Sequence, residues 1–183
     1  IGAKEAKAVS TTEIKLTLED ALADFDENDF VLYTAATTIG SEKYEVDEEL
    51  SSGKSVITFT LLDVKLDTKA NYIGNPVSIK TVAKGDVDSE NEYGSKVEIS
   101  GKAVDDAIAP ELKVTNDKPE ITRINGTSGQ VIEIIFTENV ALKSEDLAAT
   151  DFVIIDEDGD QLKALDHYTI SASADKITID LKG

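Results

Sequence analysis

Apolar residues recur at every second position along most of the chain, and this period of two constrains the fold more than any other feature. The clearest runs are residues 14–18, 57–61, 77–79, 97–100 and 177–181. Alternate side chains of a strand face opposite sides, so each run would bury one face and expose the other. Turn clusters separate the runs, and no stretch has the 3.6-residue apolar repeat of a long helix. We therefore predict an all-β chain built as antiparallel β-sandwich, with helix limited to single turns near residues 20–25 and 144–149.

Three blocks of this pattern occur twice, in the same order. Residues 14–18 match 132–136, residues 28–32 match 150–154, and residues 57–61 match 177–181, at offsets of 118, 122 and 120 residues. A fixed order with small length changes between the blocks indicates duplicated modules.

The boundary between the modules is predicted between residues 105 and 119. Pro110 and Pro119, two of the three prolines of the chain, lie in this stretch, and proline disfavours both helix and central strand. We therefore predict two consecutive Ig-like β-sandwich domains, residues 1–109 and 110–183. The first module continues well past the last shared block, whereas the second stops with it at Gly183, so we expect the second domain to be incomplete. The chain has no Met and starts at Ile1, which indicates a piece of a longer or processed protein.

The charge of the chain restricts its partners. Asp and Glu total 37 against 18 Lys and Arg, which gives a formal net charge of −19. Such a field repels phosphate backbones and anionic membrane surfaces, so we expect no nucleic-acid partner. We also expect no membrane insertion, because the longest apolar runs, such as residues 152–155, are far shorter than the roughly 20 residues of a spanning helix.

The composition contains few of the residue types on which catalysis usually depends. Cys is absent, and the chain has one His (His167) and one Arg (Arg123), so thiol nucleophiles, His-based catalysis and bidentate anion clamps lack their residues. His167 lies beside a predicted strand near residue 168 and is assigned no role. Glycosidases need two carboxyl groups at a fixed separation, usually with aromatic platforms, and the chain has no Trp. We therefore predict that the protein is not an enzyme.

Calcium is the one cofactor that the composition favours, because hard cations bind oxygen ligands and Asp-rich loops supply several of them. The candidate ligands are Asp86 and Asp88 in an acidic loop, and Asp105, Asp106 and Asp117 near the predicted domain junction. The turn at 156–160 departs from the helix-loop-helix calcium pattern, because its Gly stands at the fourth position and His167 replaces the bidentate Glu. Solvated acidic loops and an ordinary hairpin turn are the alternatives. If calcium binds the folded chain, it should raise the melting temperature.

Several segments resemble a known family. The strand at 132–140, the Thr-Asp-Phe-Val-Ile segment at 150–154, the Asp-x-Asp-Gly turn at 156–159 and the closing strand at 177–181 are similar to the bacterial Ig-like modules of surface-layer (S-layer) proteins. The junction at 103–110 is similar to the connectors between such modules. The resemblance covers the second module well and the first less closely, since residues 18–22 and the insert at 33–50 depart from the pattern.

The resemblance implies an exported structural protein of the bacterial cell wall. Its partners would be other copies of itself in a two-dimensional array, often with calcium, and a cell-wall polymer bound through modules absent from this sequence. Such modules identify an architecture more than a function. The alternative is an adhesin stalk or a carbohydrate-binding module of a secreted or cell-wall protein. An exposed aromatic patch would favour that alternative, but the five tyrosines are spread along the sequence.

Overall fold

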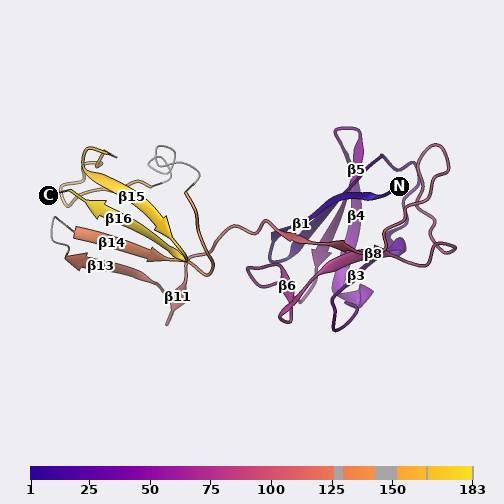
Figure 1. Cartoon of the computed structure of the whole chain (residues 1–183), viewed down its shortest axis with the longest axis horizontal. Coiled ribbons are helices and arrows are strands. Elements are labelled where there is room, and N and C mark those ends of the chain that lie inside the picture. Colours follow the sequence, from indigo (N-terminus) through magenta and orange to yellow (C-terminus); the bar gives the residue numbers. More distant parts are fainter. Residues whose placement is uncertain (126–129, 143–151, 164, 183) are drawn as a thin grey trace. The chain divides into compact units, whose positions relative to one another are not determined.

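The computed structural model describes residues 1–125, 130–142, 152–163 and 165–182 (Figure 1). The chain divides into two compact units, Ile1–Ala109 and Pro110–Gly183, called unit 1 and unit 2 below. Strands dominate both units, and the helical elements among the described residues are two short 3-10 turns, η1 (Glu27–Asp29) and η2 (Ser41–Lys43). The prediction of an all-β chain is confirmed.

The helical turn expected near residues 20–25 is wrong in position. The backbone N–H groups of Ala23 and Asp24 donate to the carbonyl oxygen of Glu90 at 2.8 and 3.1 Å, and Asp24 forms a β-bridge with that residue. The helical turn follows at η1, where the Asp26 carboxylate accepts the N–H of Asn28 as an N-cap. A distant partner therefore holds 23–24 extended and delays the turn. The turn expected near residues 144–149 lies outside the described residues.

The first sheet of unit 1 is built around the strongest alternating runs of the sequence. Its strands are ordered β10-β1-β2-β5-β4. Their bounds are β10 (Asp105–Asp106), β1 (Ala3–Ser10), β2 (Glu13–Leu18), β5 (Lys54–Leu61) and β4 (Tyr44–Ser51). All pairings are antiparallel except β10 with β1, which is parallel. Ile14, Leu16 and Leu18 on β2 are fully buried, as the period of two predicts.

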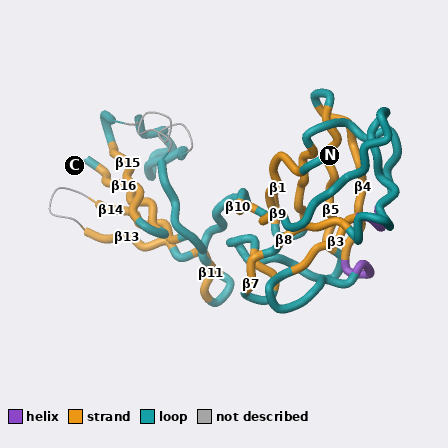
Figure 2. Tube along the Cα trace, turned by 45° about the vertical axis from the view of Figure 1, so that its right-hand side comes forward, coloured by secondary structure: helices purple, strands orange, loops and turns teal. Residues whose placement is uncertain are grey.

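A second sheet faces the first across one core. It consists of β3 (Phe30–Tyr33), β8 (Ser78–Thr81) and β9 (Lys102–Ala103), and a small hairpin, β6 (Asn71–Tyr72) and β7 (Asn75–Pro76), lies beside it (Figure 2). Side chains from both sheets join a single buried cluster, in which the rings of Phe30 and Phe59 meet edge to face at 6.4 Å. This contact fixes the two layers against each other.

The strand predicted at 97–100 is not a ladder strand. Val97 and Ile99 are buried, so the alternation in burial is right. However, the Ile99 N–H donates to the Thr81 hydroxyl at 3.2 Å, and the Thr81 N–H donates to the Ile99 carbonyl at 2.9 Å. A side-chain acceptor thus replaces part of the backbone ladder.

Residues 102–108, the crossing strand, link the two sheets of unit 1. This segment first pairs with β8 as β9, and the Val104 N–H then donates to Val77 O at 3.0 Å. It next joins β1 as β10, and the Ala107 N–H donates to Ala8 O at 2.9 Å. The crossing strand therefore closes one side of unit 1.

Unit 2 has one four-stranded antiparallel sheet with the order β13-β14-β16-β15. The strands are β13 (Ile121–Asn125), β14 (Gln130–Ile135), β16 (Lys176–Leu181) and β15 (Tyr168–Ser173). A hairpin of β11 (Val114–Thr115) and β12 (Lys118–Pro119) precedes the sheet. Phe152 and Ile154 pack against the buried face of the sheet, together with the core residues Tyr168 and Ile179.

Two of the three repeated sequence blocks occupy equivalent strands in the two units: residues 14–18 lie in β2 and 132–135 in β14, and residues 57–61 lie in β5 and 177–181 in β16. The third block differs, because residues 30–33 form β3 whereas the described residues 152–154 are not in a strand. The order β13-β14-β16-β15 reproduces β1-β2-β5-β4, and Ile134 faces Ile177 as Leu16 faces Ile57. A buried tyrosine recurs as well: the Tyr44 hydroxyl donates to Phe30 O at 3.3 Å, and the Tyr168 hydroxyl donates to Phe152 O at 3.4 Å.

Candidate functional site

The acidic loop predicted to bind calcium is organised by its inward-facing residues. Val87 and Ser89 are buried. Asp86, which precedes Val87, and Asp88, which lies between Val87 and Ser89, are exposed to solvent. The Asp86 N–H donates to Ala83 O at 2.8 Å and closes a turn. The loop alternates because every second residue enters the core, which leaves the two candidate carboxylates on its solvent-facing side.

The candidate ligands near the junction fall in different units. Asp105 and Asp106 form β10 of unit 1 and are exposed, and the Asp106 carboxylate accepts the Ile108 N–H at 3.0 Å. Asp117 lies in unit 2, in the turn of the β11–β12 hairpin, with a positive φ of 61°. Within the part of the chain that the structure describes, no three His, Cys, Asp or Glu side chains gather as a metal site. Calcium binding at these residues stays a prediction.

The turn at 156–160 is closed by hydrogen bonds to the side chain of its first residue, Asp156. The Asp156 carboxylate accepts the N–H groups of Asp158 at 3.0 Å and Asp160 at 2.9 Å, and Gly159 has a φ of +91°. Ile155 and Gln161 bridge across the base of this turn. These contacts are those of a hairpin turn that needs a residue tolerant of positive φ.

A buried carboxylate that sequence reasoning missed holds the acidic loop to the second sheet. Asp29 is only 2 % exposed, and its carboxylate accepts the Asp88 N–H at 3.2 and 3.0 Å and the Ser89 N–H at 2.6 Å. The η1 turn points this side chain inward immediately before β3. Its partners lie 59 and 60 residues away, so no local sequence signal marks the contact.

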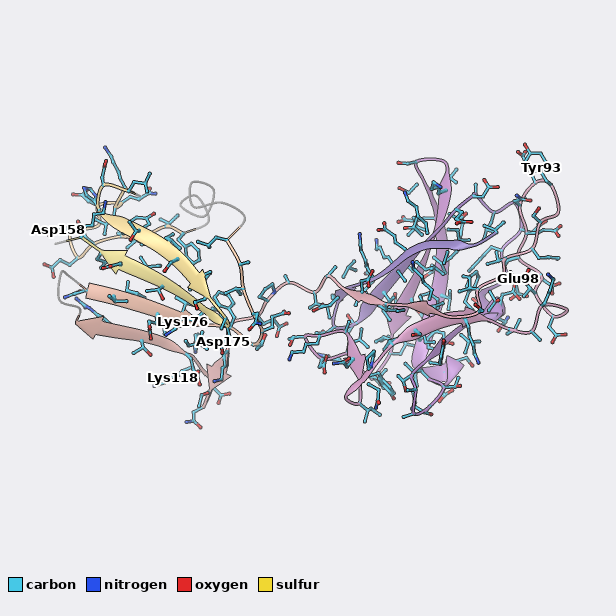
Figure 3. All side chains as sticks on the ribbon, viewed as in Figure 1. Tyr93, Glu98, Lys118, Asp158, Asp175 and Lys176 are labelled. Atoms are coloured by element: carbon cyan, nitrogen blue, oxygen red, sulfur yellow. The ribbon has the colours of Figure 1, made fainter. Side chains whose placement is uncertain are left out.

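A second contact holds the far end of the same loop. The Asp20 carboxylate accepts the Asn91 side-chain N–H at 2.8 Å and the Ala21 N–H at 3.0 Å. The hydrogen bond from Asn91, followed by that from Ala21, lowers the pKa of the Asp20 carboxyl group. Asn91 in turn accepts the N–H groups of Tyr93 and Ser95, so it organises the turn that carries the exposed Tyr93 (Figure 3).

The lowered pKa of Asp20 predicts an acid-sensitive contribution to stability. Because the folded-state pKa lies below the ordinary value of 3.8, the contribution is present above that pH and is lost as the pH falls through the folded pKa. We expect Asp20→Asn to be less stable than the wild type near neutral pH, with the difference closing as the pH falls below 3.8 and through the folded-state pKa. Urea denaturation at several pH values measures this. Asn91→Ala should reduce the acid dependence in the same way, and a difference that is independent of pH would contradict the assignment.

An acidic groove in unit 1 is lined by residues of η1, β3, the segment 38–42 and β4. Its volume is about 800 Å³, with Phe30, Ile39 and Tyr44 at its floor and four carboxylates among its lining residues. Those four are Glu27, Glu42, Glu45 and Asp47. Burial raises the pKa of the Tyr44 hydroxyl, which is engaged with the backbone of β3. The groove contains no Lys or Arg, so it attracts cations rather than anions.

The tyrosines do not form a sugar platform. Tyr44, Tyr72 and Tyr168 are buried, and the Lys80 ammonium lies 5.2 Å from the ring centre of Tyr33. Tyr93 is left as the one tyrosine that is mostly exposed. In the described residues, no helix is long and apolar enough to cross a membrane.

A paired-sheet β domain with an acidic exterior and a crossing strand defines an architecture, and an architecture does not by itself fix a function. The family model described as outer cell wall protein domain 7 matches residues 4–107, and this chain belongs to that family. The match lies in unit 1, although the sequence resemblance was closer for the second module. No curated protein matches the chain.

The solved structures that the chain matches include fragments of one bacterial surface protein. The N-terminal part of the bacterial S-layer protein SbsC is 16% identical with a TM-score of 0.43, and the match covers 92% of this chain and 33% of that one. Domains 1-6 of surface layer protein SbsC are 13% identical with a TM-score of 0.41, and the match covers 96% of this chain and 31% of that one. A titin fragment is 10% identical with a TM-score of 0.32, and the match covers 100% of this chain and 81% of that one. The chain thus spans about a third of the SbsC structures it matches.

Proposed function

We propose that this chain is a structural segment of a bacterial cell-surface array, exported to the cell wall and packed against other copies of itself through tandem Ig-like modules. The observation that carries the proposal is the match of residues 4–107 to the outer cell wall protein domain 7 family. A role as a spacer and contact module, without catalysis, is in keeping with the composition. A cell-wall polymer would be bound by other parts of the parent protein.

The distribution of side chains supports a structural role over sugar binding. Polar groups that enter the interior, such as Asp29 and Asn91, are used to fasten loops to the sheets. Three of the five tyrosine rings are buried inside the two units. Carbohydrate recognition usually relies on exposed aromatic faces, so the array is the better proposal.

Two measurements test the proposal. An antibody raised against the chain should label intact cells of the source bacterium, and the purified full-length parent protein should form ordered sheets visible by negative-stain electron microscopy. Labelling that appears only after cells are permeabilised would contradict the surface location. A parent protein that stays monomeric at every concentration and ion condition would contradict the array.

Calcium enters the proposal as a bridge between copies. A net charge of −19 makes close packing unfavourable, because like charges repel over about 8 Å at physiological salt. Because no three His, Cys, Asp or Glu side chains gather as a metal site in the described part of one molecule, a calcium ion between copies would draw carboxylates from both of them.

We therefore expect calcium to promote association of this chain more strongly than sodium at matched ionic strength. Light scattering during calcium addition and chelation measures the effect. Replacing Asp105 and Asp106 by Asn should weaken it if β10 bears the bridge, and replacing Asp86 and Asp88 should weaken it if the acidic loop does. Equal responses to calcium and sodium would leave only general charge screening.

A further inference from the structure

The outer strand of the sheet of unit 2, β15, has one open edge. The strand order is β13-β14-β16-β15, so β15 pairs with β16 along one edge, and no described residue forms a ladder or bridge along the other (Figure 1). The Lys182 N–H donates to His167 O at 2.8 Å, which makes these two residues a hydrogen-bonded pair. Because such pairs alternate along an antiparallel ladder, the backbone groups of Ile170 and Ala172 point away from β16, toward the open edge.

Unit 1 has a strand in the equivalent place, and the two strands match residue for residue. β4 pairs with β5 so that Tyr44 is opposite Leu61, and β15 pairs with β16 so that Tyr168 is opposite Leu181. The first six residues of β4 also share the burial pattern of β15, which is buried, exposed, buried, exposed, half-buried, exposed. The two edges can therefore be compared position by position.

The comparison shows that the two edges differ in charge. Four of the first six residues of β4 are acidic, whereas no residue of β15 is charged. The acidic positions of β4 are Glu45, Asp47, Glu48 and Glu49. The residues in their places on β15 are Thr169, Ser171, Ala172 and Ser173. Charged side chains on an edge strand oppose its pairing with another sheet, so β4 carries a protection that β15 lacks.

Unit 1 also shows that a unit of this kind leaves this edge open. The structure describes every residue of unit 1, and none of its segments pairs with the outer edge of β4. Its closing segment, the crossing strand, pairs with β8 and β1 instead. In unit 2 the Leu165 N–H donates to Tyr168 O at 2.8 Å, so residues 169–173 are the open part of the β15 edge. By this comparison, the partner of residues 169–173 comes from outside the unit.

A second copy of β15 fits the open edge of the first. In an antiparallel pair centred on Ser171, the exposed Thr169 of one copy is opposite the exposed Ser173 of the other, and Thr–Ser pairs of this kind hydrogen-bond across strands. Ile170 of one copy is then opposite Ala172 of the other. The backbone groups that point out of the two edges therefore satisfy one another.

Charge favours this place for a contact between copies. A chain with a formal net charge of −19 repels its own kind, and exposed charges act over about 8 Å at physiological salt. β15 itself has no charge. Asp180, which is beside Thr169 on β16, lies at opposite ends of the contact in the two copies because the strands are antiparallel. Two acidic molecules can thus meet along β15 without opposed carboxylates.

We propose that unit 2 pairs with a second copy of this chain through β15. The two β15 strands run antiparallel about a two-fold axis at Ser171, and the two four-stranded sheets join into one continuous sheet. Backbone hydrogen bonds supply most of the affinity, as in other cases of strand addition. The inference rests on the function proposed above and deepens it, because it names one surface through which copies meet.

Disulfide trapping tests the contact, since the chain has no Cys of its own. Ser171→Cys places two thiols on the two-fold axis, in a pair whose Cα atoms are about 4.5 Å apart, within the reach of a disulfide. Mild oxidation of the full chain should give a crosslinked dimer on non-reducing gels. The matched control is Asp47→Cys, at the equivalent exposed position of β4, which should stay largely monomeric. A mixture of Thr169→Cys and Ser173→Cys chains should crosslink as heterodimers in preference to homodimers.

A charge placed on the axis tests the same contact through its affinity. Ser171→Asp brings two carboxylates directly opposite each other, so the dimer dissociation constant from sedimentation equilibrium should rise at least about tenfold. Ser95→Asp, at an exposed serine of unit 1, adds the same charge and should leave the constant unchanged. Circular dichroism of each variant checks that the sheets are intact.

The outcomes separate this inference from the proposed array. Equal crosslinking of Ser171→Cys and Asp47→Cys, or a dimer that tolerates Ser171→Asp, would overturn the β15 contact. If the parent protein still formed ordered sheets in that case, its copies would meet elsewhere and the array would stand. Specific trapping at Ser171 in a parent protein that forms no sheets would contradict the array and leave the β15 contact in place.

Discussion

Replacing Asp29 by alanine should lower the free energy of unfolding of unit 1 by about 2–5 kcal/mol. The buried Asp29 carboxylate accepts hydrogen bonds from the Asp88 and Ser89 N–H groups, and the substitution leaves both donors without this acceptor. Each donor left without a partner in the interior costs about 1–3 kcal/mol, and a charged acceptor raises the figure. Urea denaturation followed by circular dichroism measures the loss.

The neighbouring carboxylate offers a matched control. Asp88→Ala keeps the backbone N–H that Asp29 binds and removes only an exposed side chain, so its effect should stay within about 0.5 kcal/mol. Hydrogen exchange in Asp29→Ala should accelerate first in residues 86–91. If the two variants were equally stable, the buried carboxylate would not be fastening the loop.

Phe59→Ala should destabilise unit 1 by about 3–5 kcal/mol, because it opens a cavity between the sheets. The ring is fully buried and lies 6.4 Å from the ring of Phe30 and 5.9 Å from the ring of Tyr44. Both the transfer energy of the aromatic ring and the edge-to-face contact are lost. Thermal and urea unfolding measure the change.

An exposed aromatic residue supplies the comparison for Phe59. Tyr93 is 80% exposed, so Tyr93→Ala should change the stability by no more than about 0.5 kcal/mol. Hydrogen exchange resolved by residue should show the effect of Phe59→Ala in β2 and β4, the strands on either side of β5 in the first sheet. Similar losses from Phe59→Ala and Tyr93→Ala would mean that this core tolerates a large cavity.

The alternating runs predicted the strands well because burial on one face is a local property of the sequence. Residues 14–18, 57–61 and 177–181 became β2, β5 and β16, and Ile57 and Ile179 are buried as their spacing requires. The first and third repeated blocks also lie on equivalent strands, β2 with β14 and β5 with β16. Patterning carries this information because each strand must place every second side chain in the core.

Features decided by distant partners were not predictable in this way. The bonds of Ala23 and Asp24 to Glu90 moved the helical turn, and Thr81 replaced a ladder partner for Ile99. The role of Asp29 depends on backbone groups about sixty residues away. The acidic residues chosen as calcium ligands from the loop and junction sequences occupy solvent-facing positions. The pattern of carboxylates along the sequence does not say which of them meet in the fold.

The parallel pairing of β10 with β1 has a mechanical consequence. Tension applied to the two ends of unit 1 would pull β1 toward Ile1 and β10 toward Ala109, so the paired strands would have to slide past each other lengthwise. The contacts at Lys7, Ala8 and Ala107 would then be loaded together instead of opening one after another. Resistance to a pulling force is set by the unfolding rate, and strand pairing that is loaded in shear slows that rate. The crossing strand thus gives unit 1 resistance to unfolding when its two ends are pulled apart.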